Sequence, residues 1–251
     1  MQHIPTRFSC VGCGACCKSR FIPLTLVEAR QWLSRGHDVV ILLEAFKRPY
    51  WSAPDPEYQH SLLRSAQVRS GATHMQATAI FAANAVAQCP NLQADDRCGI
   101  YDERPLVCRI YPMEINPFIE LKAENKDCPA DAWEDGEVIV SDAGADPTLA
   151  SLIQVSRLTD RADARAKISI CNRLGINVAA WKADALVIQF PAREQLLEAM
   201  NAEASTVKGS AAELGSWKLK VAPSPLRDEL THGQLALDEA EHVSYVFHAL
   251  K

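Results

Sequence analysis

The chain has 251 residues, of which 48% are hydrophobic and 23% are charged, and its formal net charge is −5. This length supplies enough apolar side chains for the core of one or two domains, and the slight acidity argues against surfaces that bind duplex nucleic acid or anionic membranes. No segment has the ~18 consecutive apolar residues of a membrane span. Ser9 and Cys10 precede any apolar stretch that could form a signal peptide. We therefore predict a cytoplasmic protein that binds neither nucleic acid nor membranes.

The first quarter of the chain is predicted to form a tight cysteine loop, residues 8–21, followed by helices. Thr25 and Glu28 have the spacing of a capping box, in which two side chains satisfy free backbone N–H groups at the start of a helix. Residues 39–46 are predicted to form a second short helix. The next stretch, 49–57, contains three prolines and is predicted to be a loop.

The middle of the chain gives a less uniform pattern. Residues 62–87 are rich in alanine, which favours a helix, but their periodicity leaves a buried strand open. The prolines spread through residues 89–128 predict a largely irregular segment. Residues 136–146 contain glycine and acidic residues without any aromatic side chain, and are the best candidate for a linker. We therefore predict a cysteine-cluster domain at 1–135 and a helical C-terminal region at 136–251.

The C-terminal half is predicted to be helical over residues 148–171, 193–204 and 226–250, with a short strand at 186–190. The predicted fold class is therefore mainly α, with an irregular cysteine-rich region packed on helices. An α+β fold with a few short strands is the alternative.

The cysteines are the unusual feature of the composition. Nine are present, and Cys171 is the only one outside the first 128 residues. Disulfides stabilise small secreted chains, whereas clustered cysteines in a long chain without an export signal more often bind metal or perform thiol redox chemistry. We predict that Cys171 is a buried structural thiol. The predicted metal-site residues are Cys10, Cys13, Cys16, Cys17, Cys89, Cys98, Cys108 and Cys128.

Four of these thiols lie within eight residues, as Cys10-x2-Cys13-x2-Cys16-Cys17. Two-residue spacing lets a turn direct successive sulfurs and backbone N–H groups at one centre, and Gly12 can supply the positive φ that such a loop needs. Adjacent side chains diverge, so Cys16 and Cys17 are not expected to bind one mononuclear ion together. Four thiolates saturate a zinc ion or hold one [4Fe–4S] cluster. Eight therefore suggest two centres, or one centre with spare structural thiols.

The second set begins and ends with Cys-Pro steps, at Cys89-Pro90 and Cys128-Pro129, like the closing ligand of bacterial ferredoxin loops. Cations near an anionic all-thiolate centre would stabilise it. Candidates for that role are Lys18, Arg20, Arg104 and Arg109, of which Arg109 directly follows a cysteine. Tyr101 and Tyr111 are predicted to pack in the core rather than to screen the centre from solvent.

The loop FSCVGCGACC, the sequence CPNL at 89–92, CGIYDERPLVCRIYP at 98–112 and the later Cys128-Pro129 together resemble the CxxCxxCC family of zinc- or iron-chelating proteins. These are the YkgJ-type cysteine-cluster proteins, whose relatives include flagellin lysine N-methylases. The resemblance covers about residues 7–135 and implies that the eight cysteines of the two sets form the metal site. Asn91 departs from the family pattern, which commonly has an apolar or aromatic residue there.

Three functions are consistent with this pattern. An iron–sulfur centre would support one-electron transfer or Lewis-acid chemistry in an oxidoreductase or a protein-modifying enzyme, with a protein substrate or redox partner. Zinc held by four thiolates has no open position and would make the domain a structural binding module. The third possibility is a metal-handling or thiol-redox protein. The sequence identifies no catalytic base, so it does not decide whether the protein is an enzyme.

Overall fold

The computed structural model of the protein describes residues 5–47, 55–206, 215–240 and 243–250. It is 36% helical and 27% strand, with one sheet of three strands and one of eight. The prediction of a mainly α fold is therefore wrong, and so is the alternative of only a few short strands. Within the described residues, no helix combines the length and the apolar character needed to cross a membrane.

The chain divides into two compact units that interleave in sequence. Unit 1 comprises residues 1–24 and 83–159, and unit 2 comprises residues 25–82 and 160–251. All eight cysteines of the predicted metal site belong to unit 1, whereas Cys171 belongs to unit 2. The functional boundary between residues 135 and 136 stays a prediction.

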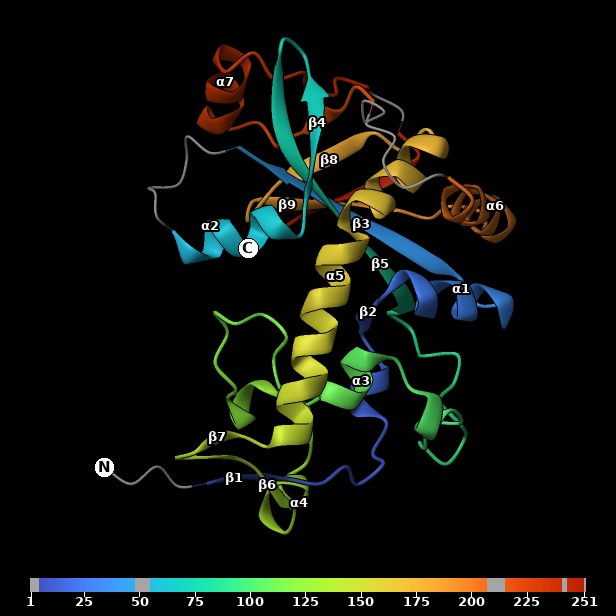
Figure 1. The fold of residues 1–251 in the computed structure, drawn as a ribbon, viewed down its shortest axis with the longest axis vertical. Coiled ribbons are helices and arrows are strands. Elements are labelled where there is room, and N and C mark those ends of the chain that lie inside the picture. Colours follow the sequence, from blue (N-terminus) through green and yellow to red (C-terminus); the bar gives the residue numbers. More distant parts are fainter. Residues whose placement is uncertain (1–4, 48–54, 207–214, 241–242, 251) are drawn as a thin grey trace. The chain divides into compact units, whose positions relative to one another are not determined.

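Unit 2 contains most of the larger sheet (Figure 1). Its pairings are mixed, because β3 runs parallel to β8 and antiparallel to β9, while β10 runs parallel to β8. Antiparallel pairing joins β4 to β5 and β9 to β11. The strands are β3 (Val39–Phe46), β4 (Ala66–Ser70), β5 (Thr73–Ala85), β8 (Val178–Trp181), β9 (Ala185–Gln189), β10 (Lys218–Lys220) and β11 (Tyr245–Ala249). The eighth strand, β2 (Arg20–Leu24), belongs to unit 1.

Burial explains why β3 was mistaken for a helix. Seven of its eight residues are buried, with Glu44 as the exception, so the strand shows a continuous apolar run instead of alternation. Such a run is typical of a strand covered on both faces, and periodicity does not distinguish it from a buried helix. Residues 62–87 resolve into the end of a helix followed by β4 and β5. Of the predicted proline loop, residues 49–54 lie outside the described residues, and Pro56 already begins a helix.

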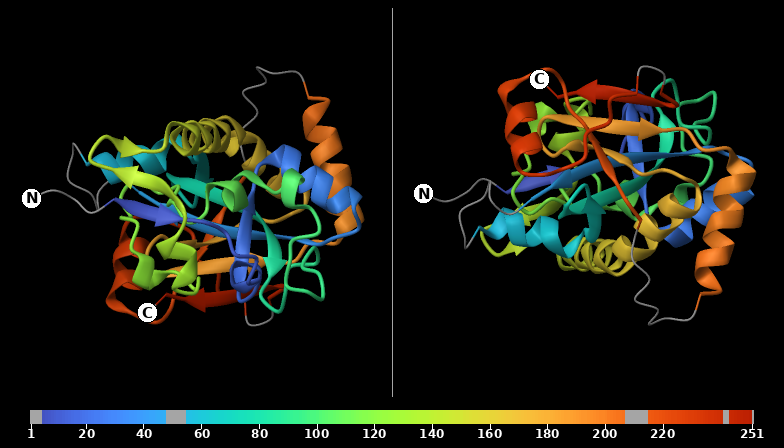
Figure 2. Two further views of the ribbon diagram at one scale, coloured as in Figure 1. Left: turned by 90° about the horizontal axis from the view of Figure 1, so that it is seen from below. Right: turned by 90° about the horizontal axis from the view of Figure 1, so that it is seen from above.

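The helices of unit 2 agree better with the prediction. α1 (Leu26–Ser34) begins with the expected capping box, in which Thr25 N donates to Glu28 Oε2 at 2.8 Å and Glu28 N donates to Thr25 Oγ1 at 3.2 Å. The helix predicted at 193–204 is α6 (Arg193–Ala204), which lies beside α1 (Figure 2). The remaining helices are α2 (Pro56–Leu63) and α7 (Pro225–His232).

Three other predictions for the C-terminal half can be compared with the structure. The predicted strand at 186–190 is confirmed as β9. The helix predicted over 226–250 is wrong, because α7 ends at His232 and the chain returns as β11, whose side chains alternate with the pleat. The helix predicted at 148–171 is confirmed as α5 (Pro147–Arg173).

Unit 1 has a small sheet, in which β6 (Glu137–Ser141) pairs with β1 (Thr6–Phe8) on one side and β7 (Gly144–Ala145) on the other (Figure 1). The predicted linker at 136–146 is therefore two strands. A Cβ added at Gly136 would lie 2.1 Å from the carbonyl carbon of Phe8, so only glycine permits this approach. The short helical segments of unit 1 are η1 (Ala15–Cys17), η3 (Tyr101–Glu103), α3 (Leu106–Ile110), η4 (Ala123–Asn125) and α4 (Asp131–Glu134).

A buried ionic cluster anchors the second half of α5 within unit 2. The side chain of Lys167 is only 3% exposed, and its Nζ lies 2.6 Å from Oδ1 of Asp160, two helical turns earlier. The second carboxylate oxygen of Asp160 accepts a hydrogen bond from Nε of Arg64, at the end of α2. Burial opposes the ionisation of Asp160, but the positive charges of Lys167 and Arg64 outweigh it and lower the pKa below the ordinary value of 3.8.

We predict that Asp160→Asn lowers the free energy of unfolding by about 2–3 kcal/mol at pH 7, because it removes the carboxylate that pairs with the buried Lys167 ammonium. The exposed control Asp228→Asn should change it by no more than about 0.5 kcal/mol. Since the pKa of Asp160 is lowered by folding, its contribution is complete above pH 3.8 and is lost as the pH falls through the folded-state pKa. Urea unfolding of both variants across this pH range measures the effect, and equal stabilities of Asp160→Asn and the control would refute it.

Candidate metal centre

The first cysteine loop is shaped by two glycines with left-handed backbone conformations. Gly12 has φ 69° and Gly14 has φ 67°, as the sequence predicted for such a loop. Cys17 N donates to Gly14 O at 3.0 Å, which closes the turn of η1 and places Cys16 and Cys17 within it. The two glycines and this hydrogen bond therefore set the backbone turn that carries Cys16 and Cys17.

Backbone hydrogen bonds attach the second cysteine segment to this loop. Cys89 N donates to Cys17 O at 2.7 Å, and Ser19 N donates to Val86 O at 3.1 Å. Lys18 Nζ lies 2.9 Å from Oδ1 of Asp96, which adds an ion pair at the surface of the same junction. Two segments that are about seventy residues apart in sequence thus bring Cys17 and Cys89 together.

Two further connections place Cys98 and Cys108 at the same junction. Leu92 and Cys98 form an isolated antiparallel bridge, which folds the segment after Cys89 back on itself. Cys108 lies in α3, which packs against β2, the strand that follows the first loop. We call Cys16, Cys17, Cys89, Cys98 and Cys108 the inner thiols.

Hydrogen bonding among the inner thiols divides them into donors and acceptors. Cys17 interacts with both Cys16 and Cys89 and keeps its proton, so its pKa is raised. The hydrogen bond from Cys17 lowers the pKa of Cys16 to about 6, and the same donor lowers the pKa of Cys89 to about 6. That Cys16 and Cys17 do not bind one mononuclear ion together stays a prediction. Burial raises the pKa of Cys108 to about 12, and the negative charges of Cys16 and Cys89 raise it further.

The other three cysteines form a more accessible group, which we call the outer thiols: Cys10, Cys13 and Cys128. Cys10 and Cys13 are exposed. Burial raises the pKa of Cys128, and the charges of Cys13, Cys16 and Cys10 add to that shift, so these thiols are electrostatic neighbours. The hydroxyl of Tyr111 lies 3.3 Å from the sulfur of Cys128 and forms a hydrogen bond with it. This contact gives Tyr111 a role beyond the predicted core packing.

Two of the four candidate cations act on an inner thiol. Arg20 and Arg104 both lower the pKa of Cys16 through their positive charge, whereas Arg109 is exposed. Arg104 stacks over the ring of Tyr101 at 3.6 Å. Arg20 forms an ion pair with Asp127, the residue before Cys128, and so links β2 to the segment that carries an outer thiol. Arg20 and Arg104 are two of the four candidates that the sequence predicted for this role, and the fold shows which of them act on Cys16.

The sulfurs do not yet form a finished coordination shell. Among the residues that the structure describes, no group of three or more His, Cys, Asp or Glu side chains is arranged to hold a metal ion as it stands. The donor set nevertheless fits zinc or iron, because thiolates are the preferred ligands of both in all-sulfur sites. Cys171 lies apart in unit 2, fully buried, where burial raises its pKa, as expected for a structural thiol.

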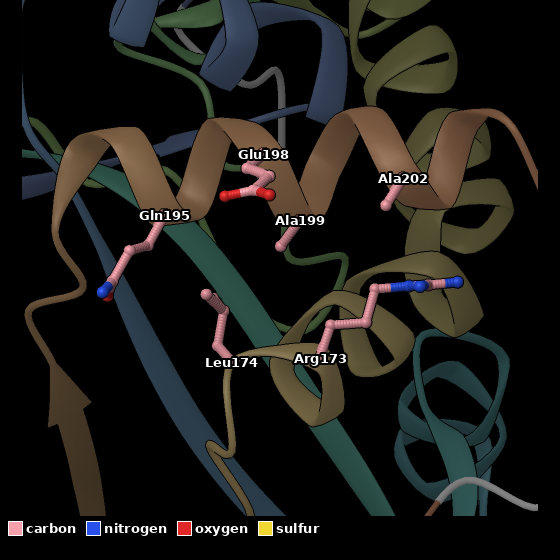
Figure 3. A pocket seen from close by; sticks show the side chains of 6 residues that line it. All are labelled: Arg173, Leu174, Gln195, Glu198, Ala199 and Ala202. Atoms are coloured by element: carbon pink, nitrogen blue, oxygen red, sulfur yellow. The ribbon is translucent and has the colours of Figure 1, made fainter.

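Neither of the two pockets described is lined by a cysteine. One, of about 410 Å³, lies in unit 2 between the end of α5 and α6 (Figure 3). Its most prominent cation, Arg173, is engaged by Glu203 and Thr206. The other, of about 440 Å³ in unit 1, includes Glu120 and Asp142 in its lining. The candidate site is therefore defined by the cysteines themselves.

The eight cysteines of the inner and outer groups all lie in unit 1. Residues 9–129 match the sequence model of the CxxCxxCC family, described as "Putative zinc- or iron-chelating domain". No curated protein and no solved structure matches the chain. The family match covers all eight cysteines of the inner and outer groups and leaves the choice between zinc and iron open.

We predict that Gly14→Ala weakens metal binding. The new Cβ would lie 2.9 Å from Oδ1 of Asp96 and 3.1 Å from Cδ1 of Leu92, so the first loop must move away from the segment that follows Cys89. Gly175→Ala is the matched control, because Gly175 has φ 69° but nothing within 4 Å of its Cβ position.

Both substitutions should cost about 1–2 kcal/mol of stability through left-handed backbone strain. Only Gly14→Ala should also reduce the metal bound per chain, measured by inductively coupled plasma mass spectrometry. Equal metal content in the two variants would show that the packing of Gly14 against Asp96 and Leu92 does not position the thiols.

Proposed function

We propose that the domain holds an iron–sulfur or zinc centre whose ligands come from the inner thiols. The observation that carries the proposal is the backbone hydrogen bond from Cys89 N to Cys17 O at 2.7 Å, which joins the two cysteine segments. A metal would replace the protons of the thiols at this junction, because its ligands must be thiolates. Cys108 is within electrostatic range of Cys16, Cys89 and Cys98, so Cys98 and Cys108 are the candidates for the remaining ligands.

The environment of the inner thiols supports an anionic centre. Arg20 and Arg104 stabilise negative charge on Cys16, as would be needed beside a four-thiolate zinc ion or a [4Fe–4S] cluster. When bound, an iron–sulfur cluster would supply one-electron chemistry for an oxidoreductase or a protein-modifying enzyme. The residues of the chain would hold the cluster, balance its charge and limit its contact with water. A redox partner or a protein substrate belongs to this proposal.

Metal handling is a second candidate, and the exposure of Cys10 and Cys13 favours it. Exposed thiols beside a more enclosed group could receive metal from solution and exchange it with the inner thiols. A purely structural zinc module, in contrast, needs only four ligands, so additional exposed thiols would not contribute to it.

Isolation of the protein without oxygen separates iron from zinc. A brown protein with broad absorption near ~400 nm, sulfide comparable to iron, and bleaching by dithionite would establish an iron–sulfur centre. A colourless protein with tightly held zinc and no response to dithionite would establish the zinc centre. Protein that takes up neither metal would refute the proposed function.

We predict that Cys89→Ser abolishes metal binding, because Cys89 connects the two cysteine segments and its thiolate is stabilised within the inner group. Thermal unfolding should also shift to lower temperature, because metal binding is coupled to folding in such domains. Cys171→Ala is the control and should retain all metal. Full metal content in Cys89→Ser would exclude Cys89 as a ligand.

The double substitution Cys10→Ser and Cys13→Ser tests the division into inner and outer thiols. We expect it to retain at least half of the bound metal and the absorption spectrum of the inner centre, because no inner thiol is changed. Metal analysis and visible spectroscopy measure both quantities. Complete loss of metal in a folded double variant would show that the outer thiols are ligands of the same single centre.

A further inference from the structure

Asn91 occupies a fixed position beside the inner thiols. The turn Cys89-Pro90-Asn91-Leu92 is closed by a hydrogen bond from Leu92 N to Cys89 O at 3.0 Å. Gly99 N donates to Asn91 O at 2.8 Å, which ties the residue to the segment of Cys98. The backbone of Asn91 is therefore held between the segments of two inner thiols, Cys89 and Cys98.

The side-chain amide of Asn91 is an unexplained donor. Its Nδ2 is shielded from solvent and has no hydrogen-bond partner of normal geometry. A buried donor without a partner costs about 1–3 kcal/mol, so such groups in folded proteins usually have a specific reason. Cys89 begins the same closed turn two residues earlier and is the inner thiol that precedes this amide in the chain.

Asn91 carries two N–H donors that follow Cys89 in this turn, one on its backbone and one on its side chain. Pro90 has no N–H, so Asn91 carries the first backbone donor after the cysteine. A leucine of similar size would fill the same space but would offer the sulfur only the backbone donor.

We propose that Asn91 is a positioning residue for the metal centre, whose Nδ2–H donates to the sulfur of Cys89 when that sulfur is bound to metal. This inference rests on the proposed function, because it requires Cys89 to be a ligand. A hydrogen bond to a metal-bound thiolate withdraws charge from the sulfur, orients the ligand and raises the reduction potential of an iron–sulfur cluster. Asn91 thereby tunes the centre without touching the metal.

Cobalt(II) provides a direct probe, because thiolate-bound Co²⁺ absorbs through charge transfer from sulfur to metal. Asn91→Leu removes the donor, and Asn91→Asp keeps the shape while replacing the N–H group with oxygen. Gln93→Leu is the matched control, since it removes an exposed amide from the same turn. The full chain is loaded with Co²⁺, and the charge-transfer band and dissociation constant are measured for each protein.

We expect both Asn91 variants to bind Co²⁺ with unchanged stoichiometry, a charge-transfer band at longer wavelength and about 10- to 100-fold weaker affinity. Gln93→Leu should match the wild type. If the isolated protein contains an iron–sulfur cluster, Asn91→Leu should also lower its midpoint potential.

A wild-type band and affinity in either folded Asn91 variant would overturn the inference while leaving the metal centre intact. If Asn91→Leu does not fold, Asn91→Asp alone decides. If the wild-type chain itself binds no Co²⁺, the proposed function fails, and this inference fails with it. The two failures are therefore distinguished by the wild-type measurement.

Discussion

The contact between Cys17 and Cys89 is the constraint on which the candidate site depends. The 2.7 Å backbone hydrogen bond between these residues fixes the distance between two segments that are otherwise irregular. This bond brings the thiols of the two segments close together. Like charges at such range oppose ionisation, so the group retains protons in the absence of a cation, and Cys17 is the residue that keeps one.

Sequence patterns predicted the long helices of this fold better than its sheet. The capping box at Thr25 and the amphipathic helices α5 and α6 depend on local spacing, which is visible in one segment at a time. The strand β3 has no alternation because the side chains on both of its faces are buried. The strands that pair with its edges include β8 and β9, which come more than 130 residues later. No local pattern contains that information. β11 was missed for a similar reason, since it becomes a strand by pairing with β9.

In the candidate site, too, local features could be predicted from the sequence and long-range ones could not. Cysteine spacing predicted the eight thiols and the left-handed glycines of the first loop. It did not predict the division into inner and outer groups, because that depends on the packing of α3 on β2 and on the exposure of Cys10 and Cys13. It also favoured Arg109 for its position next to Cys108, whereas the folded chain directs Arg20 and Arg104 at the thiols.

Charge balance connects the inner thiols to the order of the cysteine segments. Five ionised thiols would carry five negative charges, and Arg20 and Arg104 offset only two of them, with Arg20 also shared with Asp127. A dication or an iron–sulfur cluster supplies the missing positive charge without requiring more side chains. The segment from 89 to 128 contains only short helical turns, and most of the backbone hydrogen bonds within it join residues three or four apart. A centre that neutralises the thiols would therefore also link these turns to one another, and its loss would release the charge and the fold of the segment together.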